Sequence, residues 1–422
     1  MHGSNGNHRT EVLHECSMYT QQTHFNTTTG DGRTVLVRNA TIDDATALKS
    51  LYIEVYGGHY TLEVINNLSI MRQALSSHDY YWLVLEYREQ LVGSVIFLVN
   101  RRQKLAKVFA AIVREDFRGH NLTTLLIEHG IELLMRRKHW VEIVYATTRT
   151  VSPAPQRLVE HIGFKKLGIF PNVRKVLGYE THGLAGLFSE AALAARKQPV
   201  VLIPELLPLF EIVSTDLPLG KAVIEEVKPT PNIYHSDSAY DFEIIRGAPR
   251  FIQQRFSELK KRGRITMHFF PFHTPNLLLV TSDLSTEIYC HYSEADRHCV
   301  IIGYGGNRKI DNYTHFLDSI SFTLEDLGIR YLELLVGAYN PKTLREVLNA
   351  RFLPSAYFPA MRIISRGDKN PFYHPGERLD YIVFSKSFEV LDFHNIKPEG
   401  KNIDYLRYYF SMWKEMYIAR NI

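Results

Sequence analysis

Val113-Arg114-Glu115-Asp116-Phe117-Arg118-Gly119-His120-Asn121-Leu122-Thr123-Thr124-Leu125-Leu126 is the stretch that decides the fold of this chain. The apolar residues 108–113 lead into it and predict a buried strand, and apolar spacing after it predicts a helix over about residues 120–137. The first amides of a helix have no internal partners and carry partial positive charge, so such a turn can hold a phosphate. Gly119 would let the backbone approach a ligand closely. The alternative is an ordinary strand-to-helix turn of an α/β domain.

Composition and charge limit the classes of protein to consider. The 422 residues are enough for about two or three domains, and a net charge of +4 without a basic stripe gives no sign of nucleic-acid binding. No apolar run reaches membrane-spanning length. Three cysteines form no disulfide framework, which favours a cytoplasmic protein. Residues 1–33 are polar and lack the apolar core of a signal peptide, so we expect a mobile N-terminal arm.

Local sequence signals predict the order of helices and strands in the first half of the chain. A capping box at Thr41 and Asp44 opens a helix that Gly57 ends, and a turn at residues 88–90 joins two strands into a hairpin. Pro153 begins a shorter helix, where its missing N–H costs nothing. The order is strand, two helices, three strands, helix, strand, helix, strand, which predicts a mixed sheet with helices on both faces. The expected strands are residues 34–40, 81–87, 91–99, 106–113, 141–147 and 165–170, with a further one near 173–179.

Three separated motifs are informative because of the order in which they occur along the chain. They are Gln90-Leu91-Val92-Gly93, the Phe117-Arg118-Gly119 turn and Glu160-His161-Ile162-Gly163-Phe164. In this order they resemble the GNAT superfamily of acyl-CoA N-acyltransferases over about residues 34–179. The resemblance implies an α/β (α+β) fold in which a mixed, mostly antiparallel sheet is flanked by helices. It also implies direct transfer of an acetyl group from acetyl-CoA to an amine within a ternary complex.

The resemblance also implies a set of coenzyme-binding residues. In the family the turn after the central strand holds the coenzyme A pyrophosphate on backbone amides, and the strand pairs with the pantetheine arm. The matching positions are Ile112, Val113, Arg118, Gly119, His120, Asn121, Leu122 and Thr123, with Ser152 expected to bond the pantetheine. Asn121 and Thr123 depart from the small residues of the family pattern. Asn tolerates a left-handed backbone, and Thr123 can offer a hydroxyl to a phosphate.

The catalytic residues are less clearly marked. The central strand, residues 106–113, lacks the carboxylate that serves as base in many members, and Val159 stands where the family often has a Tyr acid. Candidates elsewhere are Tyr145, His59 and Glu142, with Glu54 as a further carboxylate near the expected acceptor loop. For each of these residues, a structural or solvent-facing role is the alternative.

The second half contains a copy of part of the first. Pro153 to Pro171 aligns with Pro341 to Pro359 without a gap, and Pro, Arg, Val and Phe recur in register. We therefore expect two GNAT-like domains, at residues 34–184 and 241–422, joined by a helical linker at 185–240. The glycine-rich residues 299–309 stand where the second copy should have its phosphate turn. They lack the Arg-Gly start and predict a plain loop, so the second domain is expected to be degenerate, followed at its end by an aromatic helix.

A zinc site at Cys290, His291, His298 and Cys299 is not expected, because neighbours on a strand point to opposite faces. The preferred interpretation is a cytoplasmic N-acetyltransferase with a small or amino-acid-like amine acceptor, no metal, no nucleic acid, no membrane and possibly a homodimer. Two alternatives stay open. One is a longer-chain acyltransferase, and the other is a non-catalytic protein that binds coenzyme A or acts through its second half.

Overall fold

The computed structural model describes residues 24–58, 62–175, 178–228, 240–267, 271–306, 310–366 and 372–418. The chain divides into two compact units, which are unit 1 (residues 1–99 and 106–141) and unit 2 (residues 100–105 and 142–422). This division differs from the expected boundaries at residues 184 and 240.

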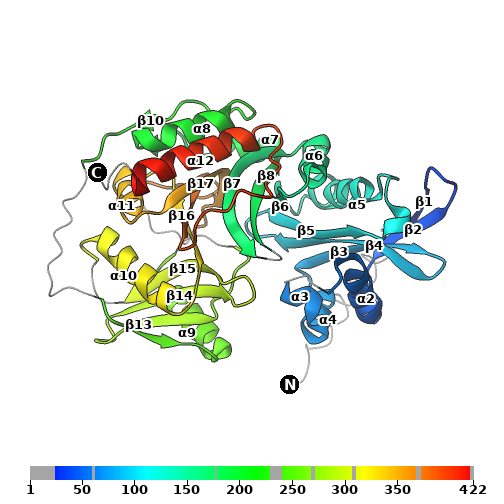
Figure 1. The fold of residues 1–422 in the computed structure, drawn as a ribbon, viewed down its shortest axis with the longest axis horizontal. Coiled ribbons are helices and arrows are strands. Elements are labelled where there is room, and N and C mark those ends of the chain that lie inside the picture. Colours follow the sequence, from blue (N-terminus) through cyan, green and yellow to red (C-terminus); the bar gives the residue numbers. More distant parts are fainter. Residues whose placement is uncertain are drawn as a thin grey trace, which may run out of the picture. The chain divides into compact units, whose positions relative to one another are not determined.

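Unit 1 is a mixed α/β layer built on a sheet in the order β1-β2-β3-β4-β5, in which the pairs from β1 to β4 are antiparallel. Helices cover both faces of this sheet (Figure 1). Its described elements are β1 (Phe25–Thr28), β2 (Thr34–Asn39), η1 (Ile42–Asp44), α2 (Ala45–Tyr56), α3 (Glu63–Asn66), α4 (Leu68–Leu75), β3 (Tyr80–Tyr87), β4 (Gln90–Asn100), β5 (Leu105–Val113), η2 (Glu115–Phe117), α5 (Leu122–Ile131) and the π-helical η3 (Glu132–Arg137).

Side chains along β4 point alternately to the two faces of the sheet, so helices can pack on both faces. Ile96 packs in the cluster formed by α2 and α4, while its neighbour Phe97 points to the other face. There Gly130 of α5 lies so close that a Cβ atom on it would stand 2.2 Å from the Phe97 ring. The glycine therefore allows α5 to rest directly on the sheet.

Several predicted signals of unit 1 are confirmed. The Thr41 amide donates to the Asp44 carboxylate at 2.7 Å, which completes the capping box, and Gly57 ends α2 in the left-handed region. Arg88 and Glu89 both have positive φ, as a tight hairpin turn requires.

In two places the structure of unit 1 adds to what was expected. Strand β1 lies within residues 1–33, which were expected to be mobile, while residues 1–23 lie outside the described ranges. The helix expected to run to Arg137 changes to π-helical hydrogen bonding at Glu132.

Unit 2 has a longer mixed sheet, mostly antiparallel, in the order β6-β8-β7-β17-β18-β16-β15-β14-β13-β11, with β12 added to β15. Helices α8 and α12 lie together over β7 and β17 (Figure 1). Its described elements are β6 (Ile143–Arg149), α6 (Pro153–Ile162), β7 (Lys165–Lys175), β8 (Tyr179–Phe188), α7 (Glu190–Ala194), β9 (Val201–Leu202), η4 (Pro204–Leu206), α8 (Leu207–Ser214), β10 (Val223–Ile224), β11 (Phe242–Ile245), α9 (Pro249–Lys261), β12 (Ile265–Met267), β13 (Leu277–Thr281), β14 (Thr286–Ser293), β15 (His298–Gly306), α10 (Tyr313–Asp326), β16 (Tyr331–Gly337), α11 (Pro341–Asn349), β17 (Leu353–Ile363), β18 (Arg378–Ser387) and α12 (Asn402–Tyr417).

Two sequence expectations for unit 2 differ from the structure, and a third, the aromatic C-terminal helix, is confirmed as α12. The linker was expected from residue 185, but β8 continues to Phe188. The glycine-rich stretch expected to be a loop is strand β15 as far as Gly306, and residues 307–309 lie outside the described ranges. The aromatic C-terminal helix packs on the sheet of its own unit, where the Tyr405 hydroxyl donates to the Lys166 carbonyl at 2.8 Å.

The repeat seen in the sequence has a counterpart in the backbone. Strand β16 begins at Tyr331, 188 residues after the start of β6 at Ile143, and β17 keeps the same offset from β7 at both ends. Even the irregularities recur, because Asn172 in β7 and Ala360 in β17 both adopt left-handed φ, of 59° and 54°. The same backbone path is therefore used twice within unit 2.

The two copies meet at equivalent positions. Gly168 of β7 pairs with Ala356 of β17, its own counterpart in the repeat. A Cβ atom on Gly168 would stand 2.2 Å from the Ser355 carbonyl oxygen and 2.3 Å from the Ala356 Cβ. Only glycine permits this approach, because the conflicting atoms include backbone.

We predict that Gly168→Ala lowers the free energy of unfolding by about 1–3 kcal/mol, since the added methyl group must push two strands apart. Urea denaturation of the full chain measures this change. Gly178→Ala is the matched control, because a Cβ there meets nothing within 4 Å, and it should change stability by less than about 0.5 kcal/mol. Equal effects of the two substitutions would contradict the close packing of β7 on β17.

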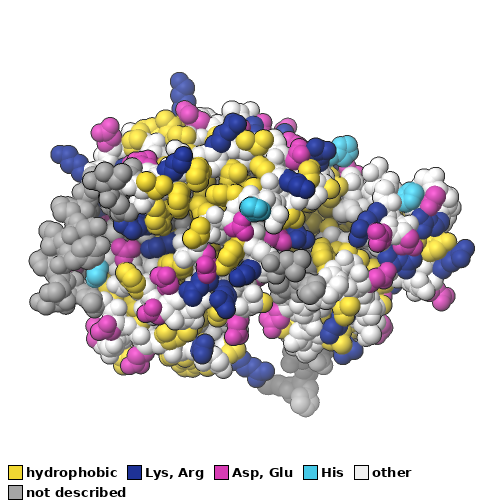
Figure 2. Space-filling model, in the orientation of Figure 1, with side chains coloured by type: hydrophobic (Ala, Val, Ile, Leu, Met, Phe, Trp, Pro, Cys, Tyr) yellow, Lys and Arg dark blue, Asp and Glu magenta, His cyan; other side chains and the backbone are white. Residues whose placement is uncertain are grey.

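Three further observations concern the whole described chain. Within those ranges, every helix is too short or too polar to cross a bilayer. The same residues hold no group of three or more His, Cys, Asp or Glu side chains placed to bind a metal ion. On the face shown in Figure 2, cationic and anionic side chains are intermixed.

Candidate functional site

The turn between β5 and α5 is the most unusual backbone feature of unit 1. After Val113 the chain makes the single 3-10 turn η2, and then Gly119 and Asn121 take left-handed φ of 84° and 56°. Asn121 stands at the N-cap of α5, but its side chain caps no amide. Asparagine is among the few residues that adopt this conformation readily, so the departure from a small residue is compatible with the turn.

A run of backbone amides is left without acceptors by this geometry. Among the described residues, none accepts a hydrogen bond from the amides of residues 119–124. The first free amides of a helix normally number four and are satisfied by caps, water or ligands. Here two further amides of the turn join them at a helix end that carries partial positive charge. The turn is therefore built to receive an anion.

Arg118 adds an exposed positive charge at the same place. Its side chain is exposed, and its Nε donates to the Val113 carbonyl oxygen at 3.3 Å. Its terminal guanidinium nitrogens contact no acceptor among the described residues. Space is open beside it as well, because a Cβ on Gly119 would meet nothing within 4 Å.

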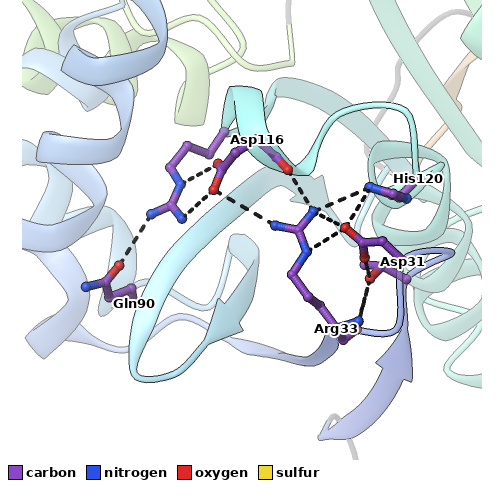
Figure 3. Close-up of polar contacts among 7 residues, drawn as sticks. Asp31, Arg33, Gln90, Asp116 and His120 are labelled. Atoms are coloured by element: carbon purple, nitrogen blue, oxygen red, sulfur yellow. Dashed lines mark hydrogen bonds and ion pairs between the residues drawn. The ribbon is translucent and has the colours of Figure 1, made fainter.

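Other charges near the turn are already paired and brace it from the β1–β2 hairpin (Figure 3). Arg33 donates to the Asp31 carboxylate at 2.8 Å and to the Asp116 carbonyl oxygen at 2.8 Å, and its guanidinium lies 3.9 Å from the centre of the Phe117 ring. His120 lies 3.4 Å from the Asp31 carboxylate. The hydrogen bonds from Arg33 and Thr29 hold the pKa of the Asp31 carboxyl well below its ordinary value, so the brace keeps its charge.

Comparison with known proteins identifies the region that contains this turn. Residues 46–164 match the model of the "Acetyltransferase (GNAT) family". The chain contains a GNAT acetyltransferase domain. The match begins in α2 and ends just after α6, so it includes β5, the turn and α5.

Solved structures similar to the chain cover about two fifths of it. The ribosomal-protein-S5-alanine acetyltransferase of Vibrio fischeri is 13% identical, covering 40% of this chain and 98% of its own with a TM-score of 0.35. The ribosomal-protein-S18-alanine N-acetyltransferase of Escherichia coli is 19% identical, covering 37% and 94% with a TM-score of 0.33. A mutant spermidine N-acetyltransferase of Vibrio cholerae is 17% identical, covering 36% and 93% with a TM-score of 0.32. A comparison with curated proteins finds no significant match.

The sequence-predicted coenzyme residues of the GNAT domain fall in two places. Ile112 and Val113 are buried at the end of β5, and residues 118–123 follow directly as the turn and the start of α5. Ser152 belongs to unit 2, where it caps α6 by accepting a hydrogen bond from the Ala154 amide at 3.4 Å. That all of them bind coenzyme A stays a prediction.

The predicted catalytic residues are in positions that suit catalysis less well than the turn suits anion binding. Glu142 of unit 2 accepts hydrogen bonds from Lys104 at 2.6 Å and from the buried Arg378 at 2.6 Å. Burial alone would raise the pKa of the Glu142 carboxyl, but these two cations outweigh it and the pKa lies below its ordinary value. Both partners favour a structural role for Glu142.

Tyr145 is buried among apolar residues of unit 2, with its ring 5.5 Å from that of Phe358. Burial raises the pKa of the Tyr145 hydroxyl far above its ordinary value, so it holds its proton. His59 lies outside the described residues, while Glu54 belongs to α2. As catalytic groups, these residues stay predictions.

A buried network beneath β5 was missed by the sequence analysis. The Tyr52 hydroxyl donates to the Ala110 carbonyl oxygen at 2.6 Å and lies 3.2 Å from the Ser94 Oγ, which accepts from the Trp82 indole at 2.7 Å. Ala110 itself has a left-handed φ of 53° in the middle of β5. The network thus holds a kink in the strand that leads to the turn. Only an apolar helical face was visible at Tyr52 in the sequence.

We predict that Tyr52→Phe lowers the free energy of unfolding by about 1–3 kcal/mol, because the buried Ala110 carbonyl loses its hydroxyl partner. Urea denaturation again provides the measurement. Tyr80→Phe serves as the control, since the Tyr80 hydroxyl bonds no described residue. If both variants lose the same stability, the hydroxyl of Tyr52 has no special part in holding β5.

Proposed function

We propose that the GNAT domain is an N-acetyltransferase that uses acetyl-CoA and transfers the acetyl group directly to an amine. The observation that supports this most strongly is the run of acceptor-free amides at residues 119–124, within the region that matches the family model. A pyrophosphate offers several anionic oxygens at once, which suits successive amides better than one carboxylate would.

The residues of the turn fit such a group. The amides would hold the pyrophosphate, the exposed guanidinium of Arg118 would pair with one of its charges, and the Thr123 hydroxyl would supply a further donor. Neither Asn121 nor Thr123 blocks the approach, because the side chain of Asn121 is exposed and Gly119 leaves open space.

The chemistry requires alignment more than covalent help. The neutral amine attacks the thioester carbonyl, a C–N bond forms, the C–S bond breaks, and the amine gives up a proton. Acetyl-CoA supplies the activated acyl group and the leaving thiolate. We propose that backbone amides near Ile112 and Val113 stabilise the developing oxyanion, and that His59 is the first group to test as acceptor of the amine proton, which in the end neutralises the departing thiolate.

We also propose that the repeated part of unit 2 is a second, degenerate GNAT-like copy. Helix α10 follows β15 as α5 follows β5, but the Asn312 side chain accepts from the His315 amide at 3.0 Å and so caps α10. The capped start of α10 offers fewer free amides than that of α5. One coenzyme site per chain is therefore expected.

The substitution Thr123→Glu tests coenzyme binding independently of folding. A carboxylate in the first turn of α5 stabilises the helix by about 0.3–1 kcal/mol, so the melting temperature without ligand should not fall. The same carboxylate repels a pyrophosphate, so the rise in melting temperature caused by acetyl-CoA should disappear. Ser69→Glu places the same charge in the first turn of α4 and should leave the acetyl-CoA effect intact. An undiminished effect in Thr123→Glu would overturn the proposed site.

Acetyl transfer itself is tested by release of the coenzyme A thiol with a panel of amines, including a polyamine, an amino acid and a peptide with a free N-terminus. Wild-type protein should release thiol in an amine-dependent reaction, and Thr123→Glu should not. Binding of acetyl-CoA without turnover on any amine would instead favour the non-catalytic alternative. A larger melting shift with long-chain acyl-CoA than with acetyl-CoA would favour the longer-chain alternative.

A further inference from the structure

A cavity of about 410 Å³ lies in unit 2, where β15 and β16 diverge. These parallel strands pair only over His298–Val300 of β15, and the short strand β12 then pairs with β15 on the side away from β14. Helices α10 and α11 and strand β18 contribute other parts of the wall. The volume is in the range of pockets that hold small organic molecules.

Glu346 of α11 lines this cavity with only 8% of its surface exposed. Among the described residues, none forms a hydrogen bond or ion pair with its carboxylate; the Thr314 hydroxyl bonds only its backbone carbonyl. Burial raises the pKa of the Glu346 carboxyl, which Lys342 one turn earlier only partly opposes. The carboxylate oxygens are not among the buried polar atoms that lack a partner, so they are reached from the cavity, where a bound cation would pair with them.

Aromatic side chains line the same cavity as this carboxylate. The rings of Tyr304 and Tyr313 lie 6.0 Å apart, and both line the cavity. Burial is the main cause that raises the pKa of each of these phenols, and the charge of Glu346 raises both further, so both lie within its field. Tyr339, Tyr373 and Tyr381 line the remaining wall. Aromatic faces beside a carboxylate are the side chains that recognise organic ammonium ions.

Two cations, Lys342 and Arg362, and a second carboxylate, that of the exposed Asp311, also line the cavity. Lys342 is exposed, and Arg362 is half-buried with its guanidinium 3.4 Å from the Tyr381 hydroxyl. Neither forms an ion pair with Glu346 among the described residues. A ligand would suit these side chains if its positive nitrogen met Glu346 and its other end, neutral or anionic, lay near the exposed Lys342.

We propose that this cavity binds a small organic ammonium ion, with its nitrogen at Glu346 and its carbon groups against Tyr304 and Tyr313. The site belongs wholly to unit 2 and does not depend on the acetyl transfer proposed for the GNAT domain. A quaternary ammonium would rely on the ring faces and the charge, whereas a primary amine would also donate hydrogen bonds to the carboxylate.

Isothermal titration calorimetry on the full chain tests this with tetramethylammonium and butylamine as probes and butanol as the neutral analogue. Wild-type protein should bind at least one of the two ammonium probes and bind butanol more weakly. Glu346→Gln should weaken the binding at least about tenfold. Glu415→Gln removes an exposed helical carboxylate outside the cavity and should leave it unchanged.

A melting experiment distinguishes lost binding from lost folding. Without ligand, Glu346→Gln should melt no lower than wild type, because it keeps the shape of the side chain and breaks no hydrogen bond or ion pair with a described residue. Ammonium probes should raise the melting temperature of wild type and not that of Glu346→Gln. If neither probe binds wild type, if butanol binds as well, or if Glu346→Gln binds equally tightly, the proposal is wrong. Should Glu346→Gln fail to fold, Thr343→Arg, which adds a cation to the cavity wall, decides the question: it should abolish binding of the ammonium probes, and unchanged binding would overturn the proposal.

Discussion

Backbone amides in a folded protein normally have hydrogen-bond acceptors. The β5–α5 turn is an exception, and the proposed function of this protein depends on it. At residues 119–124 two left-handed residues turn the chain sharply from β5 into α5, and no described residue accepts from the exposed amides. The surrounding structure holds the turn in this shape. Arg33 ties it to the β1–β2 hairpin, and Phe117 anchors its first half in the core. A polyanion completes this arrangement better than water does, because its charge also meets the helix dipole.

Unit 2 uses one backbone path twice, at residues 143–175 and 331–363. The two copies run with one offset, and they pair where Gly168 faces Ala356. The helix after β15, α10, is capped by the Asn312 side chain, whereas α5 after β5 is not capped by Asn121. We infer that the two units differ in what they bind. The β5–α5 turn of unit 1 is suited to an anion, and the cavity of unit 2 that Glu346 lines is suited to a cation.

Much of this could be predicted from the sequence because it depends on local signals. The capping box at Thr41, the hairpin at Arg88 and the β5–α5 turn each need only neighbouring residues, and the family motifs needed only their order. What could not be predicted depends on distant partners. Strand β1 is defined by pairing with β2, and Glu142 is engaged by Arg378, 236 residues away. Likewise, the sequence shows that Glu346 is charged, but its place in the wall of a cavity depends on the packing of α11.

Hydrogen–deuterium exchange at the β5–α5 turn tests the central claim most directly. Coenzyme A should slow exchange of the amides at residues 119–124, whereas pantetheine, which lacks the pyrophosphate, should not. The account predicts this difference because the amides bind the pyrophosphate and not the thiol arm. Unchanged exchange with saturating coenzyme A, or equal protection by pantetheine, would contradict it.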